Sequence, residues 1–441
     1  MKHISFSTLV LILVPCLGSQ LIASDQIPGA PQRKPIVLQN GTIHTVSGAN
    51  IEGGSLVFDQ GVITQVGRNV ETPEGAVVID LDGKHVYPSL IESHSQIGLI
   101  EIASVRASRD FAETGELNPN VSARMSVNPD SELIPVTRAS GVLLAVTAPS
   151  SGLVSGRASV MQLDGWTYED MTLKPDVAMI VNWPRMTPRT FRRVTASESE
   201  QNEARDRDLR RLRDLFDDAR AYAAARSANP DDQQFDIRLD AMADVVDGKT
   251  PLMVAASRAR EIQSAVSFAV EQNVELIILG GHDALLCADL LRKYDVPVVV
   301  SAVHRNPLRR HEDYDSSYTL PARLHEAGLR FCISASDRAE TWNTRNLGHQ
   351  ASTASAYGLP RKQALKAVTL YPAEILGISD RVGTLETGKH ATLFVCDGDP
   401  LDTEVQVTHA WIQGRQVDLS SRHTDLYDKY REKYRQQAAG E

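Results

Sequence analysis

Short apolar runs alternate with polar, helix-like stretches over the middle of the chain. The runs have the length of buried strands and lie at 142–147, 177–181, 252–256, 276–279, 296–301 and 329–334. Strands that alternate with helices indicate a parallel sheet covered by helices. The number of such runs predicts an α/β fold in which the sheet closes into a (β/α)8 barrel over about residues 86–380.

The two flanks of this region have a different pattern, that of short strands joined by tight turns. Residues 35–85 carry several turn signals, among them Asn40-Gly41, which favours a hairpin. Residues 381–418 hold apolar runs at 391–396 and 405–413. Because chain ends often lie close together, we expect both flanks to form one composite β-sandwich.

Three helical segments complete the pattern. Residues 203–228 form a long polar helix with a single apolar stripe, and their charged faces are typical of a solvated surface. A second helix is expected over 361–376, at the end of the barrel. Residues 419–441 are rich in charge and predict a surface helix or tail.

The first residues have the pattern of an export signal. Lys2 precedes an apolar run from Leu9 to Leu17, and Ala23 is a small residue of the kind found at cleavage sites. The run is too short to span a membrane. We therefore expect a signal peptide at 1–23 and an exported protein, periplasmic or extracellular. A buried N-terminal strand is the alternative.

Composition narrows the classes of partner. The chain has 441 residues, 42% of them hydrophobic, and a formal net charge of −10. An acidic chain without a basic run does not favour nucleic acid as a partner. Three cysteines follow the predicted signal, each in an apolar setting, and they cannot all pair within one chain: Cys287, Cys332 and Cys396. They are expected to be buried thiols.

The first barrel strand carries the most informative polar residues. Leu90-Ile91 begins a short strand that ends with His94 and Gln96, which lie on the same side because side chains alternate along a strand. Two histidines at these positions would be a conventional metal pair. The second position holds an amide, which is a poor ligand for a transition metal. The stretch therefore has the pattern of an altered metal-binding strand.

Several segments together resemble the amidohydrolase superfamily, in particular its exported imidazolonepropionase-like branch. The segments that carry the resemblance are 86–94, 148–156, 163–166, 364–376 and 381–400. The resemblance implies a (β/α)8 barrel with a β-sandwich built from both chain ends. It also implies metal-assisted hydrolysis of non-peptide C–N bonds, in which a divalent ion activates water and an aspartate moves protons.

The metal-binding set of this superfamily carries over only in part. Its ligands are a His-x-His pair on strand 1, histidines ending strands 5 and 6, and an aspartate on strand 8. His94 matches the first histidine and Asp337 the aspartate. Gln96 replaces the second histidine, the end of strand 5 near Ala255 has none, and Gly280 occupies the place on strand 6. The resemblance thus implies a degenerate site, with one divalent ion (zinc or similar) or none.

Two arrangements could replace the inherited site. In the first, His94, His282, His304 and Asp337 converge at the strand ends and bind a displaced metal; otherwise His282 caps a helix or faces solvent and His304 packs in a loop. A neighbouring polar segment, 311–313, is expected to be solvated.

The second arrangement needs no metal. His94 and Asp337 act as a general acid–base pair, and Arg258 or Arg338 binds an anionic substrate. Surface ion pairs are the alternative role for both arginines.

Two functions follow from these patterns. The first is a hydrolase that acts on cyclic or linear amides with a reduced or rearranged metal site. The second is an inactive relative that serves as a binding module or as the partner subunit of an intact homologue. We expect a small-molecule ligand, and a homo-oligomer or a hetero-oligomer with a related amidohydrolase. Fold cannot decide between these functions, because function resides in the site.

Overall fold

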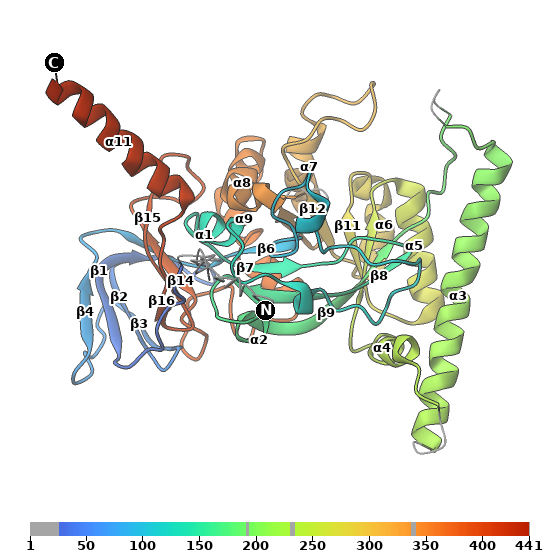
Figure 1. Cartoon of the computed structure of the whole chain (residues 1–441), viewed down its shortest axis with the longest axis horizontal. Helices are drawn as coiled ribbons and strands as arrows, with labels where there is room; N and C mark the ends of the chain where they lie inside the picture. Colours follow the sequence, from blue (N-terminus) through green and yellow to red (C-terminus); the bar gives the residue numbers. More distant parts are fainter. Residues whose placement is uncertain (1–25, 191–193, 230–233, 337–340, 441) are drawn as a thin grey trace, which may run out of the picture.

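A computed structural model gives the fold and describes residues 26–190, 194–229, 234–336 and 341–440. Two eight-stranded sheets organise these residues (Figure 1). One lies at the centre of the molecule and the other is formed by the two flanks of the sequence. The predicted signal peptide at 1–23 lies outside the described residues and stays a prediction.

The central sheet contains the predicted barrel strands in sequence order, β6 to β13. Its strands are β6 (Leu90–Ser95), β7 (Val142–Thr147), β8 (Val154–Gln162), β9 (Thr172–Asn182), β10 (Leu252–Ala256), β11 (Leu276–Gly280), β12 (Val298–Ser301) and β13 (Phe331–Ser334). The alternating side chains of these strands separate two cores. Ile91, Met253 and Cys332 belong to the core inside the barrel, whereas Leu90, Val254 and Ile333 pack with the surrounding helices.

One strand departs from a regular (β/α)8 barrel. β8 runs antiparallel to both β7 and β9, while the other neighbouring pairs of this sheet are parallel. The segment 148–156, one of those that carry the family resemblance, enters β8 at Val154. β8 is buried along almost its whole length. Its sequence therefore lacks the alternation of apolar and polar residues that identifies a half-buried strand.

The barrel is nearly closed, and side chains complete the seam between β6 and β13. No backbone ladder joins these two strands among the described residues. Instead, the backbone N–H of Ala335 donates to Glu92 Oε2 (2.9 Å), and the hydroxyl of Ser336 donates to the carbonyl of His94 (2.7 Å). The sheet therefore ends in a polar joint at its two outermost strands.

Helices cover the barrel and end the chain. They are α1 (Leu133–Arg138), α2 (Tyr168–Met171), α3 (Glu198–Ala228), α4 (Ile237–Val246), α5 (Ala259–Gln272), α6 (Ala288–Lys293), α7 (Ser316–Glu326), α8 (Leu347–Ala356), α9 (Arg361–Lys366), α10 (Leu370–Ile375) and α11 (Arg422–Gly440). Short 3-10 turns are η1 (Arg106–Ser108), η2 (Ala123–Ser126), η3 (Ala284–Cys287) and η4 (Thr341–Asn346). The helix expected over 361–376 is interrupted between α9 and α10.

The second sheet combines strands from both flanks of the sequence. It contains β1 (Ile36–Ile43), β2 (Ile51–Asp59), β3 (Val62–Gly67), β4 (Val77–Asp80), β5 (His85–Pro88), β14 (Leu393–Cys396), β15 (Val407–Ile412) and β16 (Arg415–Gln416). β14 pairs with β5, which links the flanks directly. Asn40-Gly41 forms no hairpin: Asn40 has φ 58° and the pair makes a bulge inside β1. The hairpin signal was wrong because a bulge needs the same left-handed backbone.

Two helices reach beyond this body (Figure 1). α3 begins at a capping box made by Ser197 and Glu200 and packs against α4 with the predicted stripe. α11 projects from the sheet formed by the flanks and points away from the barrel. None of the described helices is long and apolar enough to cross a membrane.

Candidate functional site

A β-bulge determines where the polar residues of β6 point. Glu92 pairs with Ala145 and Ser95 with Thr147, so β6 uses three residues where β7 uses two. Glu92 and Ser95 therefore face the same side. Ile91 faces the barrel core on the other side, and alternation after the bulge predicts that His94 and Gln96 are turned to that side too. That His94 and Gln96 share a side stays a prediction.

His94 is buried and held through its backbone. Its side chain and main chain together are 6% exposed, and its carbonyl accepts from the hydroxyls of Ser334 (3.1 Å) and Ser336 (2.7 Å). The expected partners Asp337 and Arg338 lie outside the described residues. The strand that leads to them, β13, nevertheless lies beside His94 at the seam. This is the C-terminal end of the barrel strands, where barrel enzymes build their active sites.

Glu92 is a further residue of this site and was not among the predicted site residues. It lies two residues before His94 and contacts its backbone. Glu92 is fully buried and accepts from the backbone N–H groups of His94 (3.1 Å) and Ala335 (2.9 Å). Burial raises its pKa to about 7, against the effect of these hydrogen bonds. Its position two residues before a strand-end histidine was the available signal. The carboxyl group fixes the backbone of both strands that form the seam.

The described residues do not fit the metal set of the superfamily. Gln96 presents a buried amide oxygen without a hydrogen-bond partner, which is a weaker ligand than imidazole. β10 ends at Ala256 with no ligating side chain. A Cβ on Gly280 would meet the hydroxyl of Ser257 at 2.5 Å, so the space of the strand-6 ligand is filled. One imidazole and one amide are fewer donors than a catalytic zinc site uses.

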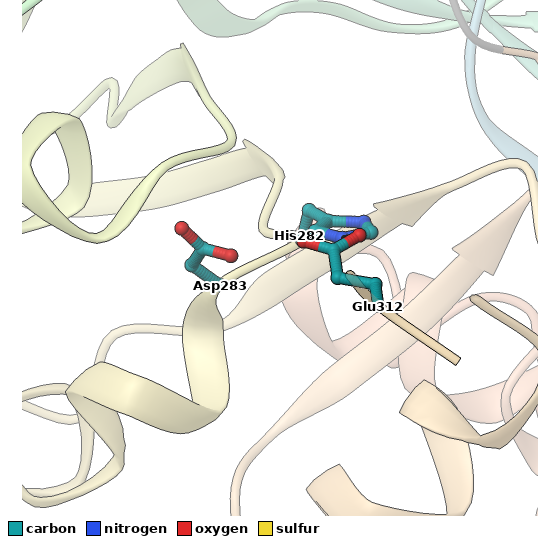
Figure 2. Close-up of side chains that lie close together, drawn as sticks. All are labelled: His282, Asp283 and Glu312. Carbon is teal, nitrogen blue, oxygen red and sulfur yellow. Dashed lines mark hydrogen bonds and ion pairs between the residues drawn. The ribbon is translucent and has the colours of Figure 1, made fainter. Parts of the chain in front are cut away.

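One group of potential ligands does come together, and it lies on the loops after β11 and β12. The donor atoms of His282, Asp283 and Glu312 lie within 4.8 Å of one another, the one such group among the described residues. Figure 2 shows the Glu312 carboxylate against the His282 ring, with Asp283 beside them. Neither His94 nor His304 joins the group, so the three histidines of the expected displaced site do not converge.

Arginines already neutralise this group. Arg309 pairs with Asp283 (2.5 Å) and with Glu312 (2.6 Å), and Arg305 contacts His282 Nδ1 (2.9 Å). His282 Nε2 is bonded to Glu312 (3.0 Å), so both ring nitrogens are occupied. Burial, and then the charge of Arg305, lowers the pKa of His282. A divalent ion would have to displace two guanidinium groups, so the arrangement is an ion-pair network.

This network corrects two expectations about the loops. The His282 side chain is 5% exposed, so it neither faces solvent nor caps a helix. Glu312 is also largely buried at 13%, whereas segment 311–313 was expected to be solvated. Both errors have the same cause: His282 and Glu312 lie on different loops and contact each other.

His304 lies apart from the network. Its Nε2 contacts the hydroxyl of Thr353 (2.6 Å), and its backbone N–H donates to Gln350 (2.8 Å). His304 is exposed and follows β12, as the sequence indicated. These contacts attach the loop after β12 to α8.

Arg258 belongs to a group of cations at the ends of β9 and β10. It is half-buried, and no described carboxylate lies within ion-pair distance of its guanidinium. Burial, and then the positive charges of Arg189 and Arg258, lowers the pKa of Arg185. The surface ion pair considered for Arg258 is therefore absent among the described residues.

Comparisons with known proteins agree with this architecture. Residues 268–417 match the sequence model of the amidohydrolase family. The chain is 22% identical over 422 residues to the amidohydrolase tasK of Hapsidospora irregularis. That alignment covers 86% of the chain and 43% of the relative, so the chain spans less than half the length of this relative.

Solved structures share the fold across most of the chain. An amidohydrolase from Thermotoga maritima superposes with a TM-score of 0.76 at 25% identity, covering 87% of this chain and 99% of that one. A prolidase solved with N-methylphosphonate-L-proline superposes with a TM-score of 0.52 at 16% identity, covering 87% and 100% of the two chains. The prolidase shows likeness in fold alone.

Proposed function

We propose that this amidohydrolase-like chain is a hydrolase that cleaves a non-peptide C–N bond in a small cyclic or linear amide. Support for the class comes from the family match over residues 268–417 and from the amidohydrolase of Thermotoga maritima, which has the same fold. The observation that carries the proposal is the bulged end of β6. The alternation of side chains after this bulge supports an inward-facing His94, at the face where barrel enzymes act.

The proposed chemistry is general acid–base catalysis. The His94 imidazole accepts a proton while a water molecule attacks the amide carbonyl. It returns the proton to the nitrogen as the C–N bond breaks, so that the products are an acid and an amine. Asp337 is proposed as the second member of the pair. No step is assigned to a metal, because the described residues do not supply the ligands.

The cations at the ends of β9 and β10 suggest the substrate class. Arg258 is half-buried without a described carboxylate partner, and Arg185 and Arg189 lie near it. A guanidinium group binds carboxylate with paired hydrogen bonds. We propose that Arg258, together with Arg338, binds an anionic group of the amide substrate, for example the carboxylate of an N-acyl amino acid.

Replacement of His94 tests this function. In a screen of cyclic amides and N-acyl amino acids, His94→Ala should lower kcat/KM by about 10²–10⁴-fold, because the proton acceptor is lost. His304→Ala is the matched control and should leave kcat/KM nearly unchanged, since His304 lies outside the barrel interior. Activity should survive treatment with a chelator.

Three results would contradict the proposal. Absence of turnover on every substrate would favour the inactive binding module. Equal activity of wild type and His94→Ala would remove His94 from the chemistry. Activity that is lost with a chelator and restored by zinc would show that a metal performs the central step.

A further inference from the structure

The last described helix presents an exposed aromatic stripe. Every residue of α11 from Arg422 to Ala439 is exposed, and the helix projects from the body (Figure 1). Four of its large side chains are 41–64% exposed: Leu426, Tyr427, Tyr430 and Tyr434. Their spacing places them on one face of the helix, within an arc of about 100°. A helix with such a face usually packs it against another surface.

Basic residues border this stripe on both sides. Arg431 lies over the ring of Tyr427 (5.4 Å), and Lys433 lies over the rings of Tyr430 and Tyr434 (both 5.7 Å). The acidic residues Asp425 and Glu432 fall on the opposite face. Residues 422–440 contain five basic and three acidic side chains, a net charge of +2. The rest of the chain therefore carries −12, from the total of −10.

A groove of complementary character opens at the base of this helix. It has a volume of about 470 Å³ and is lined by apolar Ile102, Leu133 and Trp342 and by acidic Glu101, Asp130 and Glu132. Ile102 is 57% exposed and Trp342 42% exposed. The first residues of α11, Arg422 and His423, also form part of its wall. The groove thus combines apolar side chains with an acidic rim, by which we mean Glu101, Asp130 and Glu132, and also contains the basic Arg345.

We infer that α11 of a second copy of this chain occupies the groove, and that two copies exchange their helices reciprocally. An amphipathic helix that lays its apolar face in a groove is a common recognition mode. The basic border of the helix meets the acidic rim of the groove. In each copy, α11 begins at the groove of its own chain and points away from it. A two-fold axis between two copies therefore lets each helix reach the groove of the other copy.

The charge distribution favours this occupant over a lipid surface. A basic helix with tyrosines would suit an anionic membrane. However, the body behind the helix carries −12 and would be repelled by anionic headgroups. The same negative charge attracts the basic helix of a second copy.

The exposed area is sufficient for a stable dimer. An aromatic side chain can bury roughly 150–250 Å². Three tyrosines and a leucine on each of two helices, with the groove surface they cover, would bury more than roughly 1,000 Å², the lower bound for specific interfaces. The contact is independent of the proposed chemistry, because His94 lies inside the barrel.

Sedimentation velocity of the full chain at micromolar concentration tests the inference. Wild type should sediment as a dimer, and Tyr430→Glu/Tyr434→Glu should sediment as a monomer. Gln436→Glu/Gln437→Ala, near the end of the same helix and without loss of an aromatic side chain, is the control and should remain dimeric. Circular dichroism confirms that each variant keeps its helix.

A charge exchange makes the test specific for the groove. Glu132→Lys and Lys433→Glu should each raise the dimer dissociation constant by about tenfold or more, and the double variant should recover much of the loss. High protein concentration favours a dimer by mass action, so a wild type that is still monomeric at roughly 50–100 µM would overturn the inference. So would a dimer unaffected by the tyrosine changes, or a monomer that floats with anionic vesicles.

Discussion

Glu92 is the residue whose environment most changes the description of the site. Its carboxyl group accepts from backbone N–H groups on β6 and after β13, where the barrel lacks a backbone ladder. It therefore substitutes for hydrogen bonds that a closed sheet would make. Full burial costs the charged form more than these bonds return, and the pKa rises from 4.5 to about 7.

This environment predicts how stability depends on pH. Between pH 4.5 and 7 the unfolded chain loses the proton of Glu92 while the folded protein keeps it, so stability falls as pH rises through this window. The difference between the two pKa values corresponds to about 3 kcal/mol. Glu92→Gln cannot ionise and should show a smaller decrease in the free energy of unfolding between pH 4.5 and 7.5, measured by urea denaturation.

The exposed Glu326 provides the control for this experiment. Glu326→Gln, at the end of α7, should keep the wild-type dependence on pH. If Glu92→Gln and wild type lose the same free energy across the window, the carboxyl group is ionised in the folded protein at all these pH values.

At the scale of elements, the antiparallel β8 and the bulge in β6 shape the barrel. β8 places a hairpin where a helix would separate two parallel strands. Alternation after the bulge predicts that His94 and Gln96 face the inner side of the sheet. The end of β11 is shaped differently, since Gly280 has φ 104° and lies against Ser257. This backbone keeps a side chain out of the place where the superfamily has a histidine.

Gly280→Ala should therefore be costly. It forces a residue with a Cβ into a left-handed conformation and brings that Cβ to 2.5 Å from Ser257 Oγ, which should lower the free energy of unfolding by about 1–3 kcal/mol or more. Gly248 has φ 72° and open space around it. Gly248→Ala therefore measures the cost of the left-handed backbone alone and should lower the free energy of unfolding by about 1 kcal/mol. Urea denaturation of both variants measures the difference.

Removal of the Ser257 hydroxyl separates the two contributions. In the Gly280→Ala background, Ser257→Ala should recover the stability lost to the steric contact. The loss caused by the left-handed backbone should remain. Equal stability of Gly280→Ala and Gly248→Ala would show that the contact with Ser257 relaxes at no cost.

At the scale of the whole molecule, one hydrophobic cluster extends from the barrel into the sheet formed by the flanks. β5 continues into β6 with Ser89 as the only residue between them, and β14 pairs with β5. Phe394 of β14 packs in the same cluster as Leu90 of the barrel. Because consecutive strands link the two sheets and side chains of both pack in one cluster, we expect the sheets to unfold together.

Trp411→Ala tests this coupling. Trp411 is fully buried in the sandwich beside Phe58, so its truncation should cost about 3–5 kcal/mol. Far-UV circular dichroism, dominated by the barrel helices, should report a single transition moved to lower urea. Trp166→Ala, 66% exposed, should change stability by less than about 0.5 kcal/mol. Two separate transitions, of which Trp411→Ala moves one, would contradict a common core.

The sequence alone determined most of the barrel strands and the long polar helix. Apolar runs such as 142–147 and 252–256 coincide with β7 and β10, because burial on both faces requires an unbroken apolar segment. The polar helix after residue 198 was recognisable from its stripe. His94 was identified as a strand-end residue, and Gln96 and Gly280 were identified at positions where the resemblance would place metal ligands.

Tertiary structure decided what those residues contact. Glu92 serves the seam because β6 and β13, more than 230 residues apart, meet there. His282 contacts Arg305 and Glu312 of the next loop, and Asn40 bulges because β1 continues past it. The direction of β8 also depends on its neighbours. Local patterns carry periodicity and composition, whereas these features depend on contacts between distant segments, which a single sequence does not encode in readable form.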